Sequence, residues 1–225
     1  MKNYGNWANL AKCEIPNKKN PYDNAGAEHN RLMAVIESKG NPKMSLDEVF
    51  DLCDDVLREE FGSQLIPNYS SKKLATPIIN IDSEREFETY INSLDLNQET
   101  KDYLFELYEI LFEYDSTNLC SVVGKVKEFE DRILASKGSA NIENILISSS
   151  VGRYSLAYWN DRYGNETFVA RAFWKKFFTA VADCVGATAG AIAGSATVVG
   201  GIAGGITGAI GASAGFSVVW DVFAN

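Results

Sequence analysis

His29 is the single histidine of the chain and the residue best suited to act as a base or a metal ligand near neutral pH. Asp23 and Glu28 lie near it in sequence. Nucleophilic catalysis would also need a nearby cysteine, or a serine in a nucleophile-elbow context, and neither accompanies His29. We therefore predict that His29 packs as a polar residue of a helix, that the chain has no catalytic residue, and that it is not an enzyme.

Acidic side chains recur on one face of the segment 47–59, in a spacing that superficially resembles a metal site. They are Asp47, Asp51, Asp54, Asp55 and Glu59. No EF-hand loop of the D-x-D-x-D-G type is present, so a solvated helix face is the better interpretation. Glycine-rich nucleotide loops need a preceding strand and a Gly-Lys-Ser/Thr or G-x-G-x-x-G frame, whereas the glycines of the C-terminal tail follow a helix and their stretch contains no lysine. We expect neither a metal ion nor a cofactor.

Cysteine chemistry is the remaining possibility, and the spacing speaks against a metal-binding or redox motif. Cys13, Cys53, Cys120 and Cys184 are far apart, and no C-x-x-C pair occurs. We predict free, buried thiols, with two disulfides as the alternative.

The most informative residues are ten glycines in the C-terminal region, many of them spaced by four. They are Gly186, Gly190, Gly194, Gly200, Gly201, Gly204, Gly205, Gly208, Gly211 and Gly215. On a helix, residues four apart lie along one stripe, and a stripe without side chains lets a second backbone approach closely. We predict that these glycines mediate helix packing, either in a membrane or in a tightly packed core.

The length of this region favours two helices over one. No charged residue lies between Cys184 and Trp220, and one helix of that length would measure roughly 55 Å against a hydrocarbon core of about 30 Å. We expect a helical hairpin that turns near Gly200-Gly201. Ten glycines cost a helix nearly 10 kcal/mol relative to alanine, at about 0.8–1 kcal/mol each, so close packing, a membrane or an oligomer must offset that cost.

Three environments for the hairpin remain open. Insertion into a bilayer is favoured by its isoleucines and valines and opposed by Asp183, at up to about 3 kcal/mol if the carboxylate is central. A hairpin buried in a soluble fold or at an oligomer interface is the second option. An irregular glycine-rich loop is the third.

The rest of the chain shows helical periodicity. We expect helices from Asp23 or Asn24 toward Ser38, after a capping box at Ser45–Glu48, after a second box at Ser83–Glu86, and at about 98–114, 117–136 and 141–163, with another starting near Glu166. Residues 63–81 are expected to be loop, with a short extended stretch at 77–81. The predicted fold class is all-α: a helical bundle followed by a C-terminal Gly/Ala-rich helical hairpin.

Charge divides the chain and limits its partners. The net charge is −9, all Lys and Arg residues lie at or before Lys176, and only Asp183 and Asp221 are acidic beyond it. We predict an acidic helical domain at 1–165 and a hydrophobic hairpin domain at 166–225. An acidic chain of this kind argues against nucleic acid, which requires clustered basic residues.

The expected partners and location follow from the hairpin. We expect a membrane or self-association through the hairpin, with a protein partner as a further option. The first residues lack the apolar segment of a Sec signal peptide. The protein is therefore expected to stay in the cytoplasm or to leave by a non-Sec route, in either case with membrane association as an option.

Two further motifs carry a resemblance. Asn20-Pro21-Tyr22-Asp23-x-x-Gly26-x-x-His29-Asn30 and Tyr154-Ser155-x-x-Tyr158-Trp159, together with the small-residue tail, resemble a group of uncharacterised bacterial proteins. The tail also resembles the glycine zippers of bacteriocins, although this chain is longer and acidic. The resemblance to zippers implies self-association or membrane insertion.

Taken together, these features predict a membrane-interacting protein of a pore-forming or toxin/bacteriocin-like type that acts through a glycine-zipper hairpin. In this reading the front helices cover the hairpin until it is released. The alternative is a soluble helical binding or scaffold protein that uses the Gly-rich tail as its core or as a homo-oligomer interface.

Overall fold

The computed structural model describes residues 13–41, 43–62, 70–79, 81, 83–115, 118–136, 141–163, 170–194 and 198–224, and at 84, 163, 170–178, 198–199 and 216–224 it describes the backbone alone. These residues form nine α-helices: α1 (Asn24–Lys39), α2 (Leu46–Phe61), α3 (Ser71–Ala75), α4 (Glu84–Ser93), α5 (Gln98–Phe112), α6 (Leu119–Ala135), α7 (Ile142–Tyr163), α8 (Ala170–Gly194) and α9 (Val198–Ala224). The all-α fold class is confirmed.

Local hydrogen bonds fix where several helices begin. At the start of α2, the Ser45 hydroxyl accepts from the Glu48 backbone N–H at 3.3 Å, and the Glu48 carboxylate accepts from the Ser45 N–H at 2.7 Å. This is the predicted capping box, and it satisfies two donors that a helix start leaves free. The Ser83 hydroxyl accepts from Glu86 in the same way at α4.

The segment expected to be loop contains the short helix α3. Its first turn is fixed by α2, because Asp54 accepts from the Ser71 N–H at 2.8 Å and the Ser71 hydroxyl donates to the Phe50 carbonyl at 3.2 Å. Residues 76–79 form a turn rather than an extended stretch. Tertiary contacts to α2 therefore override the weak local signal of this segment, and residues 63–69 and 80 lie outside the described part of the chain.

The hairpin turns earlier than predicted. Helix α8 ends at Gly194 and α9 begins at Val198, so the connection spans residues 195–197, which are not described, and Gly200-Gly201 lie inside α9. The prediction of a turn at Gly200-Gly201 was wrong because these glycines serve the contact between helices. The predicted start near Glu166 falls on residues outside the described ranges, and α8 is described from Ala170.

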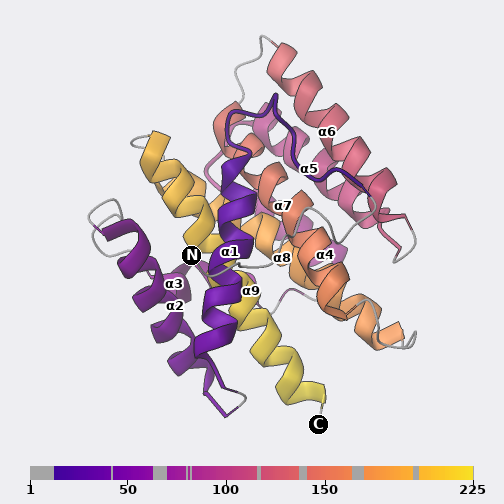
Figure 1. The fold of residues 1–225 in the computed structure, drawn as a ribbon. Helices are drawn as coiled ribbons and strands as arrows, with labels where there is room; N and C mark the ends of the chain where they lie inside the picture. The colour runs from indigo at the N-terminus through magenta and orange to yellow at the C-terminus, as the bar shows by residue number, and fades with distance from the viewer. Residues whose placement is uncertain are drawn as a thin grey trace.

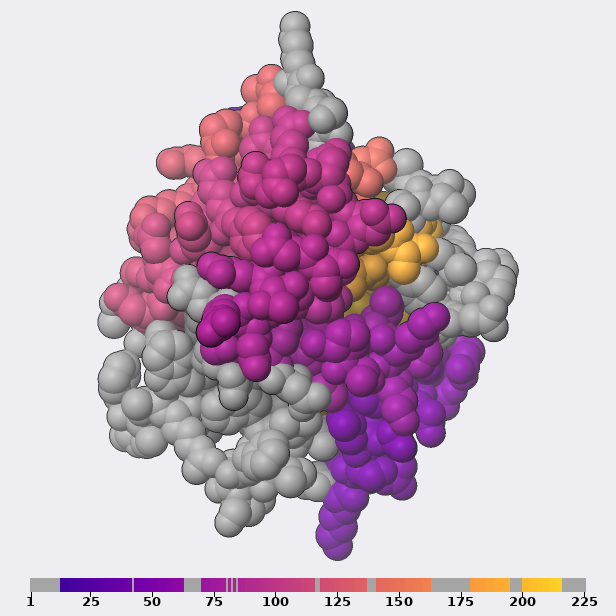
Figure 2. All heavy atoms as spheres, turned by 180° about the vertical axis from the view of Figure 1, so that it is seen from behind, coloured from indigo at the N-terminus to yellow at the C-terminus, as the bar shows by residue number. Residues whose placement is uncertain are grey.

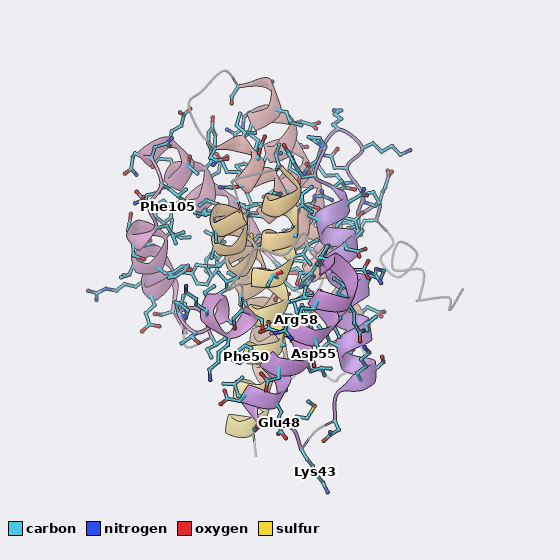
Figure 3. All side chains as sticks on the ribbon, turned by 90° about the vertical axis from the view of Figure 1, so that its left-hand side faces the viewer. Lys43, Glu48, Phe50, Asp55, Arg58 and Phe105 are labelled. Atoms are coloured by element: carbon cyan, nitrogen blue, oxygen red, sulfur yellow. A yellow bond between two sulfur atoms is a disulfide. The ribbon has the colours of Figure 1, made fainter. Side chains whose placement is uncertain are left out.

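The hairpin lies at the centre of the molecule. Helix α8 packs most extensively on α9 and next on α7, while α1, α2 and α3 all pack on α9. In Figure 1, α1 crosses the front, α5 and α6 lie on one side, and α2 and α3 lie on the other. Figure 3 shows the hairpin helices between α4–α5 and α1–α2. Buried residues of both predicted domains, such as Val126, Val151, Val185 and Ile210, belong to one hydrophobic core.

One disulfide joins the N-terminal segment to α6. Cys13 and Cys120 are bonded, with Cα atoms 5.2 Å apart, whereas Cys53 and Cys184 are free and buried. The prediction of free thiols holds for the second pair and was wrong for the first. The two bonded cysteines are separated by 107 residues, and only the path of residues 13–23 along α6 brings them together.

Candidate functional site

Six of the ten predicted glycines face one another between α8 and α9. A methyl group at Gly186, Gly190 or Gly194 would overlap the carbonyl oxygen of Gly208, Gly204 or Gly200, respectively. Glycines spaced by four residues along α8 thus face glycines spaced by four along α9, and the two helices run antiparallel. The two backbones approach so closely that no larger residue fits at these positions without separating the helices.

The other four glycines let neighbouring helices approach α9. Gly201 and Gly205 face Ile147 of α7, and a Cβ at Gly205 would lie 2.6 Å from the Ile147 Cγ2 atom. Gly211 faces the backbone of Ser71 in α3, and Gly215 faces Ile79 and Phe50. The glycines therefore serve two purposes, closing the hairpin and seating it against α2, α3 and α7.

The described side chains of the hairpin are almost all buried by the rest of the chain. Between 180 and 194 and between 200 and 215, the exceptions are Ala189, Ile192 and Ile202, which are half-buried, and Ala193, which is exposed. Several polar groups are buried with them: Thr179, Asp183, Thr188, Thr207 and Ser213. The described part of the hairpin, 179–194 and 200–215, is thus covered largely by other helices of its own chain.

Asp183 is the acidic residue within this buried region. Its carboxylate accepts from the Trp159 indole N–H at 3.0 Å and from the Ser155 hydroxyl, and the His29 Nε2 atom lies 3.8 Å away. Burial raises the pKa of Asp183, while His29, Ser155, Trp159 and Ser213, in that order, act to lower it. The carboxylate therefore fastens α8 to α7 and lies beside α1.

This cluster has the residue types of a hydrolase but a different geometry. The Ser155 hydroxyl donates to Asp183, and the His29 Nδ1 atom lies 3.1 Å from the Asn30 side-chain oxygen, so serine and histidine meet the carboxylate separately. A nucleophilic serine needs a hydrogen bond to its base. His29, Ser155 and Asp183 are also fully buried. The arrangement is that of an internal attachment between helices.

A second buried polar cluster joins the N-terminal segment to α6 and α7. Arg153 donates to Glu130 at 3.0 Å and to Asp23 at 2.6 Å. Glu130 also accepts from Asn17 at 2.7 Å, from Asn20 at 2.9 Å and from Ser149 at 2.7 Å. These bonds compensate for burying the charges, so the pair holds its segments in one arrangement.

The structure brings the two sequence motifs together. Asn30 of the first motif donates to the Tyr154 carbonyl at 2.8 Å, and the Tyr154 hydroxyl donates to Asp23 at 3.1 Å. Gly26 has no room for a side chain, because a Cβ there would overlap the Ser150 carbonyl. The motif residues thus dock α1 on α7, which in turn packs on α8.

Sequence reasoning did not find Glu130 and Arg153, and it considered Asp183 only as an obstacle to membrane insertion. Glu130 and Arg153 lie at ordinary positions of helical patterns, and nothing local marks them as buried. Asp183 carried a usable signal, because a lone carboxylate beside a long uncharged stretch must find donors on another helix if it is buried.

Neither a metal site nor a membrane-spanning helix is found in the described part of the chain. Its His, Cys, Asp and Glu side chains form no group of three or more that could hold a metal ion. No helix within those ranges reaches the length and apolar character needed to cross a bilayer. Comparison of the chain with protein-family models, curated proteins and solved structures gives no match.

Proposed function

We propose that this is a membrane-interacting protein, of a pore-forming or toxin-like type, that carries a Gly/Ala-rich hairpin covered by its own helices and exposes it at a lipid surface. The observation that supports the proposal is the pairing of Gly186, Gly190 and Gly194 with Gly208, Gly204 and Gly200. These contacts lie wholly within the hairpin, so α8 and α9 keep them when the covering helices move away.

Release of the hairpin from the covering helices requires that its buried polar groups lose their hydrogen bonds. The hydrogen bonds of Asp183 to Ser155 and Trp159 must break, and the carboxylate must then enter the lipid or stay at its surface. An ionised carboxylate at the bilayer centre costs about 3 kcal/mol on insertion scales. The protonated acid avoids most of that cost, and burial in the folded chain already raises the pKa of Asp183 and so favours the protonated form before release.

A disulfide that ties α8 to α7 tests the proposal. A Cβ at Gly152 would lie 3.6 Å from the Cys184 Cβ atom, within the range of about 3.5–4.5 Å seen in disulfides. We expect oxidised Gly152→Cys to release little dye from loaded vesicles, and the same protein to release as much as the wild type after reduction, because only the free hairpin can leave α7.

Two controls isolate the new bond. Gly152→Ser adds a side chain of similar size without a second thiol, and the wild type under the same oxidising and reducing conditions reports the effect of the native Cys13–Cys120 bond. The proposal fails if oxidised Gly152→Cys releases as much dye as the reduced protein. It also fails if the wild type releases none from either zwitterionic or anionic vesicles between about pH 4 and pH 8.

The alternative is a helical binding or scaffold protein in which the hairpin is a permanent core. The polar attachment of α8 to α7 favours it: the Ser148 and Thr188 hydroxyls are 2.8 Å apart, and the Cys184 thiol donates to the Ser148 carbonyl at 3.3 Å. On this reading the Gly152→Cys bond changes stability alone, and the wild type leaves vesicles intact.

A further inference from the structure

A cavity lies between α4 and α5. Its volume is about 340 Å³, and one stripe of each helix lines it. The apolar part consists of Phe87 and Ile91 of α4 and Phe105, Tyr108 and Phe112 of α5. Figure 2 shows the α4–α5 face, in magenta, at the centre of the back of the molecule, and Figure 3 places Phe105 on the side away from α1 and α2.

The aromatic rings form an ordered wall. The Phe87 ring meets Tyr108 edge to face with centroids 5.1 Å apart, and it meets Phe112 with centroids 6.3 Å apart. Phe87 and Tyr108 are buried, whereas Phe105 and Phe112 remain half-buried. Half-buried rings at a cavity give a ligand both apolar surface and the negative face of a π system, which attracts cations.

Two carboxylates lie at the same cavity. Glu88 of α4 and Glu109 of α5 both line it and both are exposed. Neither has an ion-pair partner among the described side chains, whereas Glu106 of α5 pairs with Arg132 and Glu113 pairs with Lys125. The cavity thus combines an aromatic wall with two negative charges that lack a counter-ion.

We propose that this cavity binds a small organic cation, an ammonium group carried on an apolar or aromatic body. The volume lies at the lower end of the range of about 300–1,000 Å³ for small-molecule sites. The apolar body packs against the aromatic wall, while the ammonium group lies between Glu88 and Glu109. This proposal does not depend on membrane activity, and its test uses no lipid.

Calorimetric titration of the full chain with 2-phenylethylammonium, 2-phenylethanol and phenylacetate tests this proposal, because the three probes share a body and differ in charge. We expect the ammonium to bind about three- to tenfold more tightly than the alcohol, because its ion pairs with Glu88 and Glu109 are partly solvated and each contributes little. The carboxylate is expected to bind most weakly. Added salt is expected to reduce the preference for the ammonium.

Three variants locate the site. Glu88→Gln/Glu109→Gln is expected to weaken ammonium binding to the level of the alcohol and leave the alcohol unchanged, and Phe105→Leu is expected to weaken the ammonium more than the alcohol. Asp51→Asn/Glu128→Gln removes the same charge from exposed positions on α2 and α6 that have no ion-pair partner among the described side chains, and it is expected to leave binding of all three probes unchanged. Equal binding of ammonium and alcohol, equal effects of the two double variants, or no binding up to about 10 mM would each overturn the proposal.

Discussion

At the residue scale, the two buried polar clusters stabilise the fold in different ways. Asp183 is held by neutral donors and a histidine, and burial disfavours its charged form. Arg153 is held by two carboxylates, each with further donors. The free energy of unfolding should therefore depend on pH through Asp183. It should depend on the ion pair of Arg153 with Glu130 in the second cluster.

Asp183→Asn is expected to change how stability depends on pH. Because burial raises the pKa of Asp183 above the ordinary aspartate value of 3.8, the folded protein binds this proton more tightly than the unfolded chain. The stability it contributes is fully present below about pH 3.8 and is lost as pH rises through the raised pKa. Urea unfolding should thus show Asp183→Asn gaining stability relative to the wild type as pH rises from 4 to 7. Asp51→Asn, on the exposed face of α2, should show no such gain.

Arg153→Met is expected to lower the free energy of unfolding by about 3–5 kcal/mol, because it leaves the Glu130 carboxylate buried without its cation. Arg153→Met/Glu130→Gln removes that stranded charge and should recover part of the loss. Urea unfolding of both proteins measures the difference. If the double variant is less stable than the single one, the charge pair does not explain the loss.

At the element scale, the sequence predicted most helices, and tertiary contacts account for the differences. Amphipathic spacing and the Ser45 cap are local signals, so α2 is predictable from its own residues. Glycines spaced by four predicted close contact with a helix, but not which helix. That Gly211 meets α3 whereas Gly190 meets α9 depends on long-range packing, and the same packing creates α3 from a segment with little local helical signal.

Two glycine-to-alanine changes are expected to have opposite signs. A methyl group at Gly190 would overlap the backbone of Gly204, so Gly190→Ala should destabilise the protein by about 1–3 kcal/mol despite the better helix propensity of alanine. Gly124 in α6 has nothing within 4 Å of a Cβ, so Gly124→Ala should stabilise by up to about 1 kcal/mol. Thermal unfolding of both variants checks the pair. Destabilisation by both would mean that contact between backbones is not the cause.

At the scale of the whole molecule, the chain folds around its own C-terminal hairpin. The uncharged stretch suggested where the apolar material lies and that the front helices cover it, but not that α1, α2, α3 and α7 are the helices that pack on the hairpin. The α4–α5 cavity and the Cys13–Cys120 bond had no sequence signal, because each joins residues whose proximity exists only in the folded protein.

Cys120→Ser is expected to lower stability by about 2–5 kcal/mol, because it opens a cross-link across 107 residues and so frees the unfolded chain. Beyond this global loss, local protection should fall most in the N-terminal segment, where Asn17 and Asn20 reach Glu130. Hydrogen exchange measured by mass spectrometry would show a larger increase in exchange in residues 13–23 than in α5 or α7. An equal increase in all three would contradict a local role for the bond.

The matched glycine faces of α8 and α9 also allow two partly unfolded molecules to exchange helices. The face of α8 fits any α9 that arrives antiparallel in the same register, whichever chain supplies it. Two opened molecules can therefore exchange α9 and restore every glycine contact, which is domain swapping with no new interface to form. Refolding from concentrated solution would then yield intertwined dimers beside monomers, and dilution during refolding would favour the monomer.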